Sequence, residues 1–363
     1  MPGRLEGIGW FTYQTFKRIA LAHPEVEFHF IFDRTFDEQF VFADNIKPVV
    51  LFPQARHPVL YYLFFEKALP AYLKKIDPAL FVSPDGLLSL SWKGCQIPVF
   101  HDLNFMHNPG YLPFLSSKYY RWRFPKFAEK AHRIATVSEY SKSDIVKTFN
   151  YPAAQVDVVY NGVNETFMPV SEDVARETRQ LYTGGNPYFL YVGSLHKRKN
   201  IDNMLLAFEA FKATDSRNHK LMIVGEHMFG TNGLQKVLDS MNHKEDVVFT
   251  GRLYNDQLSR VVASASALLL VSFFEGFGIP IIEAMKCDVP VISSNVTSMP
   301  EVAGKAALLV DPHSVNAISQ AMQKVVNDQS IRLGLIENGR LVRQKFSWDL
   351  TAQRMWESMS HCL

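Results

Sequence analysis

Short apolar segments rich in β-branched residues alternate along this chain with longer amphipathic segments, a pattern typical of parallel sheets wrapped by helices. The pattern runs through the chain twice. In the first half it predicts strands at Glu27–Phe32, Val49–Leu51, Leu80–Ser83, Pro98–Phe100, Ile134–Val137 and Val156–Val159, and helices at Phe11–Ala22, Leu60–Lys75, Leu115–Lys130 and Ser141–Asn150. In the second half it predicts strands at Tyr188–Val192, Leu221–Val224, Val247–Thr250, Ala267–Val271, Val289–Ser293 and Ala307–Val310, with the last two helices at Val315–Asn327 and Gln329–Lys345.

Two such series predict an α/β protein with two Rossmann-like, doubly wound parallel sheets, each binding ligands at the carboxyl ends of its strands. A chain of 363 residues is also longer than one ordinary core requires. The polar stretch Asn164–Thr183, which carries Pro169, is the expected linker region. We therefore expect an N-terminal domain over residues 1–165 and a C-terminal domain over residues 166–346.

Composition narrows the class of protein. A hydrophobic content of 47% and a charged content of 20% fit a globular protein, and a net charge of +2 gives no sign of a nucleic-acid partner. Cys95, Cys287 and Cys362 are odd in number and far apart in sequence, with neither zinc-site spacing nor a disulfide framework. No apolar run approaches the roughly 18 residues of a membrane span, and no signal-peptide core is seen. These features predict a cytoplasmic location.

The segment Ser272–Glu283 carries the clearest candidate chemistry. It leads from a predicted buried strand through a turn containing Gly276 and Gly278 into a helix expected to begin at Pro280. Glycines let a ligand approach backbone N–H groups, and a helix start favours an anion. A carboxylate about 4 Å from a phosphate would be repelled by roughly 4 kcal/mol, so the glutamates of this segment should face sugar hydroxyls. The pattern indicates a nucleotide-sugar.

A simpler interpretation also fits the two glutamates of this segment. Glu283 would only be favoured by the dipole of a first helical turn, and Glu275 would be a solvated loop acid. The motif alone does not decide between the two interpretations.

The run Glu275-Gly-Phe-Gly-Ile-Pro-Ile-Ile-Glu283 resembles the Glu-x7-Glu signature of the retaining family 4 glycosyltransferases, which have the GT-B fold. The similarity spans nearly the whole chain, with several motifs in the family's order. These motifs are Val99–Asp102, Thr136–Ser141, Val159–Val163, Tyr191–Asn200, Val289–Ser293, Met299–Gly304 and Ala307–Pro312.

The resemblance implies a donor site in the C-terminal domain. Lys199 would bind the diphosphate, helped by Arg198 and Ser194, which stands where many relatives have an arginine. Glu275 would hold the sugar hydroxyls and Glu283 the ribose. The turns that would clasp the nucleobase contain Gly225, Arg252 and Leu253, and the backbone N–H groups expected near the phosphates are those of Phe277, Gly278 and Ile279.

The N-terminal domain would supply the acceptor side. His101, just past a predicted strand, would contact the transferred sugar, and Asp102 would orient its loop. Gly7-Ile8-Gly9 resembles the glycine turn that reaches the diphosphate, although Glu6 replaces a common glycine. The first strand usual in the family is not found, which would expose backbone groups of its neighbours. Residues 347–363 are expected to pack back on this domain, and the active site is expected between the domains.

These implications predict a retaining glycosyltransferase that moves a hexosyl group from a nucleotide-diphospho-sugar, with GDP-mannose favoured and a UDP-sugar open, to an acceptor hydroxyl in glycan or polysaccharide synthesis. His101, Lys199 and Glu275 would be its catalytic residues, with no cofactor. No Asp-x-Asp cluster is present, so no metal is expected. Two alternatives remain, a nucleotide-sugar epimerase of the same architecture and a weakly catalytic donor-binding subunit of a polysaccharide-assembly complex.

The acceptor is expected to be a glycan or a lipid-linked glycan. The stretch Lys118–Lys130 interleaves aromatic with basic residues, which would suit peripheral contact with anionic lipid at the inner face of a membrane. An amphipathic helix packing on its own sheet explains the same pattern. The sequence does not indicate the oligomeric state.

Overall fold

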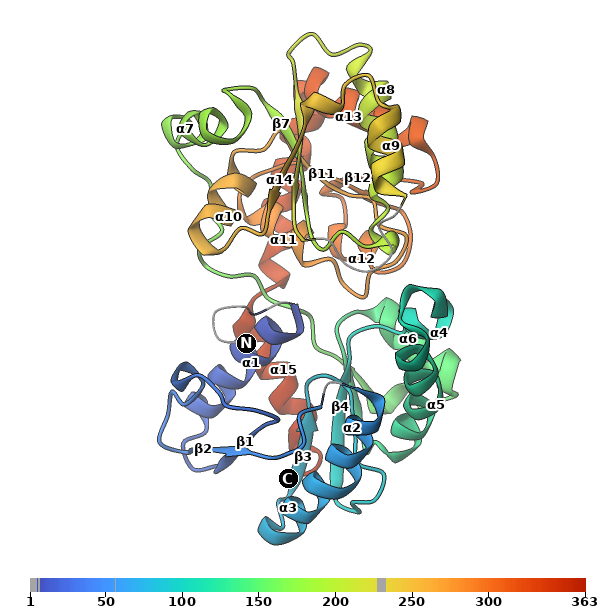
Figure 1. Ribbon diagram of the computed structural model, residues 1–363. Helices are drawn as coiled ribbons and strands as arrows, with labels where there is room; N and C mark the ends of the chain where they lie inside the picture. The colour runs from blue at the N-terminus through green and yellow to red at the C-terminus, as the bar shows by residue number, and fades with distance from the viewer. Residues whose placement is uncertain (1–4, 6, 56, 227–232) are drawn as a thin grey trace. The chain divides into compact units, whose positions relative to one another are not determined.

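The computed structural model describes residues 5, 7–55, 57–226 and 233–363, and it divides into two compact units. Unit 1 comprises Met1–Gly162 and Ser347–Leu363, and unit 2 comprises Val163–Phe346. Each is an α/β body in which helices cover parallel strands (Figure 1). Within the described ranges, no helix combines the length and the apolar character that a bilayer-crossing segment needs.

Unit 1 follows the predicted alternation closely. Its strands are β1 (Phe28–Phe32), β2 (Ile46–Val50), β3 (Leu80–Ser83), β4 (Cys95–Phe100), β5 (Ile134–Thr136) and β6 (Val156–Val158). Its helices are α1 (Gly7–Ala22), α2 (Pro58–Leu63), α3 (Leu69–Ile76), α4 (Asn104–His107), α5 (Phe114–Lys130), α6 (Glu139–Phe149) and α15 (Trp348–Ser360).

The strands of unit 1 form two separate parallel sheets. One pairs β1 with β2, and the other has the order β3-β4-β5-β6. Among the described residues, β1 and β3 are each an edge strand whose second side has no strand partner. The doubly wound sheet expected for this half is therefore interrupted between β1 and β3.

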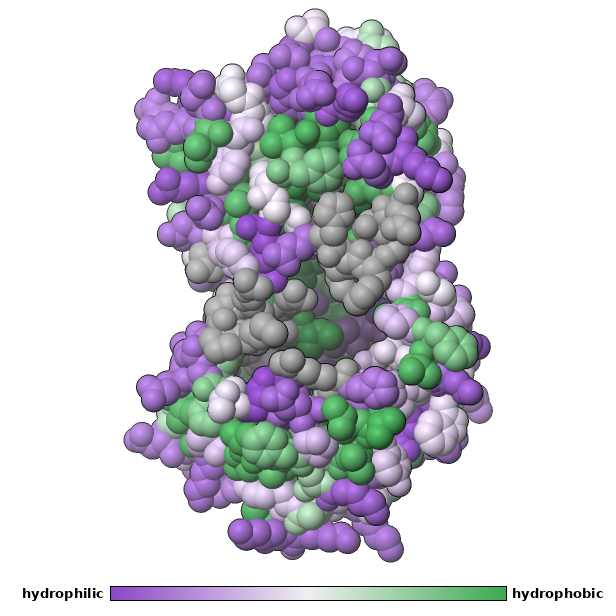
Figure 2. Space-filling view, viewed as in Figure 1, coloured by the Kyte–Doolittle hydropathy of each residue, from purple (hydrophilic) through white to green (hydrophobic). Residues whose placement is uncertain are grey.

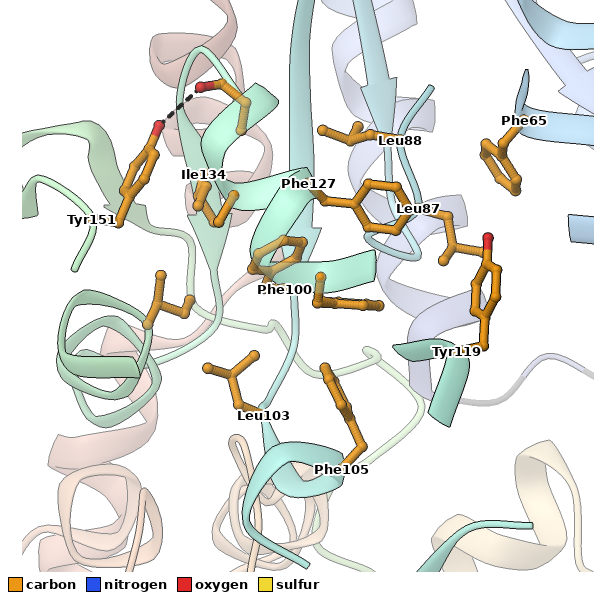
Figure 3. Packing of buried hydrophobic residues seen from close by; sticks show 14 of the residues in the cluster. Phe65, Leu87, Leu88, Phe100, Leu103, Phe105, Tyr119, Phe127, Ile134 and Tyr151 are labelled. Carbon is orange, nitrogen blue, oxygen red and sulfur yellow. Dashed lines mark hydrogen bonds between the residues drawn. The ribbon is translucent and has the colours of Figure 1, made fainter. Parts of the chain in front are cut away.

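The core of unit 1 lies between the four-stranded sheet and the helices that cover it. Phe100 on β4 and Phe127 on α5 are fully buried, and they pack with residues of the loops after β3 and β4 (Figure 3). The Tyr151 hydroxyl lies at the border of this cluster and donates to the Ala131 carbonyl oxygen at 3.1 Å. The core thus fixes the loop that follows β4, which carries His101.

The helix expected at Leu60–Lys75 is broken. A π-helical turn, Phe64–Ala68, separates α2 from α3, and Pro70 lies in the first turn of α3. Glu66 in this turn is buried, and its carboxylate accepts from the backbone N–H groups of Leu90 and Ser91 and pairs with Arg123 on α5. A π-turn changes the direction of a side chain, which hydrophobic spacing alone does not predict.

Helix α15 belongs to unit 1, where it packs along α1. Arg18 pairs with Asp349 at 2.6 Å across the two helices, and the Thr351 hydroxyl donates to the Tyr160 carbonyl oxygen. A Cβ at Gly162 would lie 2.3 Å from the backbone nitrogen of Trp348, so only glycine allows this close approach.

The expectation that the cysteines form no disulfide was wrong. Cys95, the first residue of β4, is bonded to Cys362 after α15, with Cα atoms 6.3 Å apart. The two residues lie 267 positions apart in sequence, and only the return of α15 to unit 1 brings them together. Cys287 in unit 2 is a buried free thiol.

Unit 2 contains one six-stranded parallel sheet with the order β12-β11-β10-β7-β8-β9. The strands are β7 (Tyr188–Val192), β8 (Lys220–Val224), β9 (Val247–Gly251), β10 (Ala267–Leu270), β11 (Val291–Ser294) and β12 (Ala307–Val310). The helices are α7 (Glu172–Thr183), α8 (Ile201–Lys212), α9 (Leu234–Ser240), α10 (Asn255–Ala263), α11 (Ile279–Lys286), α12 (Met299–Ala303), α13 (Val315–Asn327) and α14 (Gln329–Val342).

The strand order reverses between β7 and β10, because β8 and β9 extend the sheet on one side and β11 and β12 on the other. In open α/β sheets, ligands bind outside the carboxyl ends of the strands at such a switch point. The loops that follow β7 and β10 are therefore where the topology favours a ligand.

Candidate active site

Three predicted site residues of unit 2, Arg198, Lys199 and Glu275, gather at this switch point. Lys197–Lys199 form a short 3-10 turn after β7, and Glu275 lies in the loop after β10. The two loops are joined through the backbone, since the Phe273 N–H donates to the Arg198 carbonyl oxygen at 2.8 Å. Two segments more than 70 residues apart in sequence thus share one edge of the sheet.

Glu275 is the centre of a charged cluster. Its carboxylate accepts from Lys199 Nζ at 2.5 Å, from Arg198 Nη1 at 2.8 Å and from the Ser272 hydroxyl at 2.7 Å. Burial alone would raise the pKa of Glu275, but the charges of Lys199 and Arg198 outweigh burial and lower that pKa from 4.5 to about 2. Glu275 is consequently ionised throughout the physiological range.

The structure adds a contact to the expected division of charge. Arg198 and Lys199 are expected to face phosphates and Glu275 to face hydroxyls, and the three side chains also bind one another. Two cations and one carboxylate leave the cluster with a formal charge of +1. A net positive, partly buried cluster attracts an anion more strongly than the same charge in open water would.

Several side chains that hold this loop were not singled out from the sequence. The Ser298 hydroxyl donates to the carbonyl oxygens of Glu275 and Phe277, at 2.9 and 3.2 Å. Asn200, at a positive φ of 60°, donates from Nδ2 to the carbonyl oxygens of Val271 and Pro312. Both side chains act on backbone groups from other elements, and no local pattern reveals such contacts.

The glycine turn after β10 has the geometry that the sequence predicts. Gly278 has φ +98°, in the left-handed region, and it precedes α11. The helix begins at Ile279, one residue before the expected Pro280. Phe277 is buried, and its ring packs edge-on against Phe346. Its side chain therefore belongs to the core, and only its backbone contributes to the turn.

The turns expected near a nucleobase follow β8 and β9. Gly225 has φ +154°, and a Cβ there would lie 1.8 Å from the carbonyl oxygen of Gly193, so the β7 and β8 turns touch through backbone atoms. Ser194 follows at once, and its carbonyl oxygen accepts from the Tyr191 hydroxyl at 2.9 Å. After β9, Arg252 stacks over Tyr254 with 5.0 Å to the ring centroid, and Leu253 lies half-buried between them in sequence.

Glu283 lies on α11 and does not join the charged cluster. Among the described residues, its carboxylate has no cation or hydrogen-bond donor, and burial raises its pKa from 4.5 to about 7. Glu275 and Glu283 therefore differ sharply in protonation although they belong to one motif. The first is always charged, and the second changes charge near neutral pH.

Replacing Glu283 with glutamine should make unit 2 more stable at pH 8. When the pKa of a carboxyl group is higher in the folded than in the unfolded state, the protein loses stability as pH rises between the two values, here from 4.5 to about 7. The full loss in the free energy of unfolding is at most about 3 kcal/mol. Glu283→Gln has no carboxyl group at this position and should not show that loss. Chemical denaturation followed by circular dichroism at pH 5 and pH 8 measures the difference, with the exposed Glu337→Gln on α14 as the control. Equal pH dependence in wild type and Glu283→Gln would contradict the assignment.

The site residues predicted in the first half lie in unit 1. His101 follows β4, its Nε2 donates to the Pro84 carbonyl oxygen at 2.9 Å, and its ring meets the Phe11 ring edge-on. Burial lowers the pKa of His101, so the ring is neutral at pH 7 and its Nδ1 is an acceptor. Asp102 accepts from the Asn104 N–H at 2.9 Å, as expected for a residue that orients the loop.

The predicted glycine turn was wrong in one respect. Gly7 and Gly9 do not precede the first helix, because α1 begins at Gly7 and contains both. A Cβ at Gly9 would lie 3.1 Å from a methyl group of Leu5, so the Leu5 side chain lies close to this first helical turn. The neighbouring Glu6 lies outside the described residues.

Comparisons with known proteins agree with this architecture. An O-antigen chain mannosyltransferase B from Escherichia coli is 28% identical over 356 residues, which cover 95% of this chain and 93% of that protein. Sucrose-phosphate synthase from Thermosynechococcus elongatus superposes with a TM-score of 0.79 at 21% identity, covering 98% of this chain and 93% of that one. Anabaena HepE in complex with UDP-glucose superposes with a TM-score of 0.77 at 16% identity, covering 99% of this chain and 98% of that one.

Two family models divide the chain between them. The model described as Glycosyltransferase Family 4 matches residues 10–167, and the model described as Glycosyl transferases group 1 matches residues 175–342. The first match lies almost wholly in unit 1 and the second in unit 2. With both halves matched and the GT-B neighbours superposing over nearly their full length, the chain belongs to the family 4 glycosyltransferases of the GT-B fold.

Proposed function

We propose that this glycosyltransferase takes a mannosyl group from GDP-mannose and transfers it, with retention of configuration and without a metal ion, to an acceptor hydroxyl in polysaccharide assembly. The observation that carries the proposal is the cluster of Arg198, Lys199 and Glu275 at the switch point of unit 2. It combines a net positive charge with a permanently ionised carboxylate beside a glycine turn, which suits a diphosphate joined to a sugar.

In this proposal Lys199 and Arg198 stabilise the negative charge that develops on the diphosphate as the glycosidic bond breaks. Glu275 holds them in place and accepts from hydroxyls of the transferred sugar. The neutral His101 of unit 1 contacts that sugar, and its Nδ1 accepts a hydrogen bond from a sugar hydroxyl. The acceptor attacks from the face that the diphosphate leaves, and a phosphate oxygen takes the acceptor's proton. No residue of the chain then needs to become covalently attached to the sugar.

The other donor-binding roles are proposed from the places that the residues take in the motifs and the fold. Glu283 binds the ribose, the N–H groups of Phe277, Gly278 and Ile279 lie near the phosphates, and Ser194 adds its hydroxyl to the same group. The turns at Gly225 and at Arg252 and Leu253 hold the base, and the first turn of α1, with Gly7 and Gly9, approaches the diphosphate from unit 1.

We favour GDP-mannose as the donor because the relative from Escherichia coli, which matches nearly end to end, is a mannosyltransferase. A UDP-sugar is the competing donor, since the Anabaena neighbour was solved with UDP-glucose. Thermal unfolding in the presence of GDP-mannose, UDP-glucose and ADP-glucose separates the two. A ligand at 100 times its dissociation constant stabilises the protein by about 2.7 kcal/mol. We expect GDP-mannose to raise the unfolding temperature most, and a response to UDP-glucose alone would overturn the choice of donor.

Incubation of the protein with the donor, with and without an acceptor, distinguishes the alternative activities. Transfer should occur with retention, visible in the anomeric signals of the product by nuclear magnetic resonance, and it should survive exhaustive EDTA. An altered or hydrolysed donor formed without acceptor would indicate the epimerase. Donor binding without turnover over a broad set of mannan and lipid-linked acceptors would indicate the binding subunit.

We further propose that unit 1 touches a membrane at the cytoplasmic face when the acceptor is lipid-linked. Helix α5 buries Phe124 and Phe127, as expected for a helix that packs on its own sheet, yet Phe114 is 77% and Trp122 56% exposed, with Lys126 stacked over the Trp122 ring. Figure 2 shows further hydrophobic side chains on unit 1 over α2, where Val59, Tyr62 and Leu63 are exposed.

Flotation with anionic and neutral vesicles at low salt tests the membrane contact. The protein should float with anionic vesicles and float less when both Phe114 and Trp122 are changed to serine, because both the basic and the apolar groups of the helix contribute. A wild-type protein that stays wholly unbound to anionic vesicles would end this part of the proposal.

A further inference from the structure

A second cluster of reactive side chains lies in unit 1, away from the residues assigned to sugar transfer. The sulfur atoms of Cys95 and Cys362 and a ring nitrogen of His132 all lie within 4.8 Å of one another. They come from three separate parts of the fold, namely the start of β4, the second residue after α15 and the loop before β5. Two cysteines and a histidine are ligands that zinc prefers.

We propose that the reduced protein binds one Zn²⁺ ion through Cys95, Cys362 and His132, with water as the fourth ligand. Three sites of a tetrahedron are then filled by soft or borderline donors from the chain, a donor set known for zinc. Oxidation of the two cysteines to the disulfide seen here excludes the ion, because both thiolates are consumed in the S–S bond.

The surroundings of the cluster suit a cation bound by thiolates. A hollow of about 440 Å³ adjoins it, and Lys93, Lys130 and His361 line this hollow together with the three proposed ligands. Two thiolate ligands neutralise the charge of a divalent ion, so a bound ion would add no net positive charge beside Lys93 and Lys130. The hollow also gives an ion a route from solvent, since His132 and His361 are exposed.

Reduction of the disulfide frees both cysteines to bind the ion. A dithiol or phosphine reductant supplies two electrons to the Cys95–Cys362 bond and is itself oxidised, which leaves two thiols after uptake of two protons. Each thiol then loses its proton to solvent as its sulfur binds the ion. In a reducing compartment the ion would thus replace the covalent bond as the link between α15 and β4.

Position separates the proposed ion from the residues assigned to sugar transfer. Cys95 begins β4, whereas His101 follows the end of the same strand. Six residues at about 3.3 Å each place the cluster roughly 20 Å along the sheet from His101. The site therefore stands at the amino ends of β4 and β5, opposite to the edge where α/β sheets bind substrates.

Cobalt substitution of the reduced protein tests the site directly. With phosphine-reduced, metal-free wild type under anaerobic conditions, one equivalent of Co²⁺ should give the thiolate-to-cobalt charge-transfer band and the intense visible bands of tetrahedral cobalt. Zn²⁺ should abolish both. Cys95→Ser and Cys362→Ser should each remove most of the charge-transfer intensity. His132→Ala should weaken Co²⁺ binding by at least about 100-fold, because losing even an outer-shell partner costs 10- to 100-fold.

Cys287→Ser is the matched control, because Cys287 is a buried free thiol that lies in unit 2. The cobalt spectrum of this variant should equal that of wild type. A second measurement covers variants that fold poorly. In reduced wild type, Zn²⁺ should raise the unfolding temperature of unit 1, and the disulfide-bonded protein should show no such rise. A reduced wild type without charge-transfer bands, or bands that survive in both Cys95→Ser and Cys362→Ser, would overturn the proposal.

Discussion

Replacing Lys199 with alanine should lower the rate of sugar transfer by about 100- to 1,000-fold, the range found when one preorganised group that stabilises developing charge is removed. Lys199 is one of two cations at the switch point of unit 2, and its side chain is only 13% exposed. Without it the cluster loses its net positive charge, so the departing diphosphate meets less stabilisation. The loss should fall mainly on kcat, because the charge develops as the bond breaks.

The fold should survive this substitution. Glu275 keeps Arg198 and the Ser272 hydroxyl as partners, so its carboxylate is not left unpaired. Lys197→Ala is the matched control, since Lys197 lies in the same 3-10 turn but is exposed, and it should retain nearly full activity. Steady-state kinetics of the two variants, with circular dichroism to verify folding, completes the test. Near-normal turnover in Lys199→Ala would refute the role of this lysine.

Replacing Arg123 with methionine should destabilise unit 1 by about 3–5 kcal/mol, the cost of leaving one partner of a buried ion pair unpaired. The side chains of Arg123 and Glu66 are only 5% and 7% exposed. Burial lowers the pKa of Arg123, because removing the guanidinium from water disfavours its charged form. Methionine keeps much of the apolar contact, so the loss reports the charge.

Urea denaturation followed by tryptophan fluorescence measures this loss in unit 1 alone. All five tryptophans, Trp10, Trp92, Trp122, Trp348 and Trp356, belong to that unit. Adding Glu66→Gln to the variant should recover part of the stability, because a neutral amide can remain buried more cheaply than a carboxylate. The exposed pair Lys47–Glu27, which also lies in unit 1, is the control, and Lys47→Ala should cost no more than about 1 kcal/mol. A similar loss in Arg123→Met and Lys47→Ala would contradict this prediction.

Much of the fold could be predicted because its elements have strong and local patterns. Strands β3, β7 and β12 and helix α13 have the predicted bounds, since each is a sharply delimited apolar or amphipathic run. Failures arose where distant parts of the chain decide the structure. The π-turn at Phe64–Ala68 carries Glu66, which pairs with Arg123 from the distant α5, and the disulfide depends on α15 returning to unit 1.

The candidate site shows the same division. The family resemblance assigned Lys199 and Glu275 to one donor site, and the structure brings the two side chains into contact. The mutual pairing of Glu275 with Arg198 and Lys199 could not be predicted, because spacing does not say whether a cation faces a ligand or a neighbouring carboxylate. The different protonation of Glu283 likewise follows from burial in three dimensions.

The return of α15 has a consequence for how the protein is made. Unit 2 is one uninterrupted stretch, Val163–Phe346, whereas unit 1 needs its opening segment and Ser347–Leu363 together. While the chain is still being synthesised, the ribosome has released every residue of unit 2 before it releases the helix that covers α1. Multidomain chains ordinarily fold from the N-terminus onward. Here the half that is translated first is the half that can be completed last.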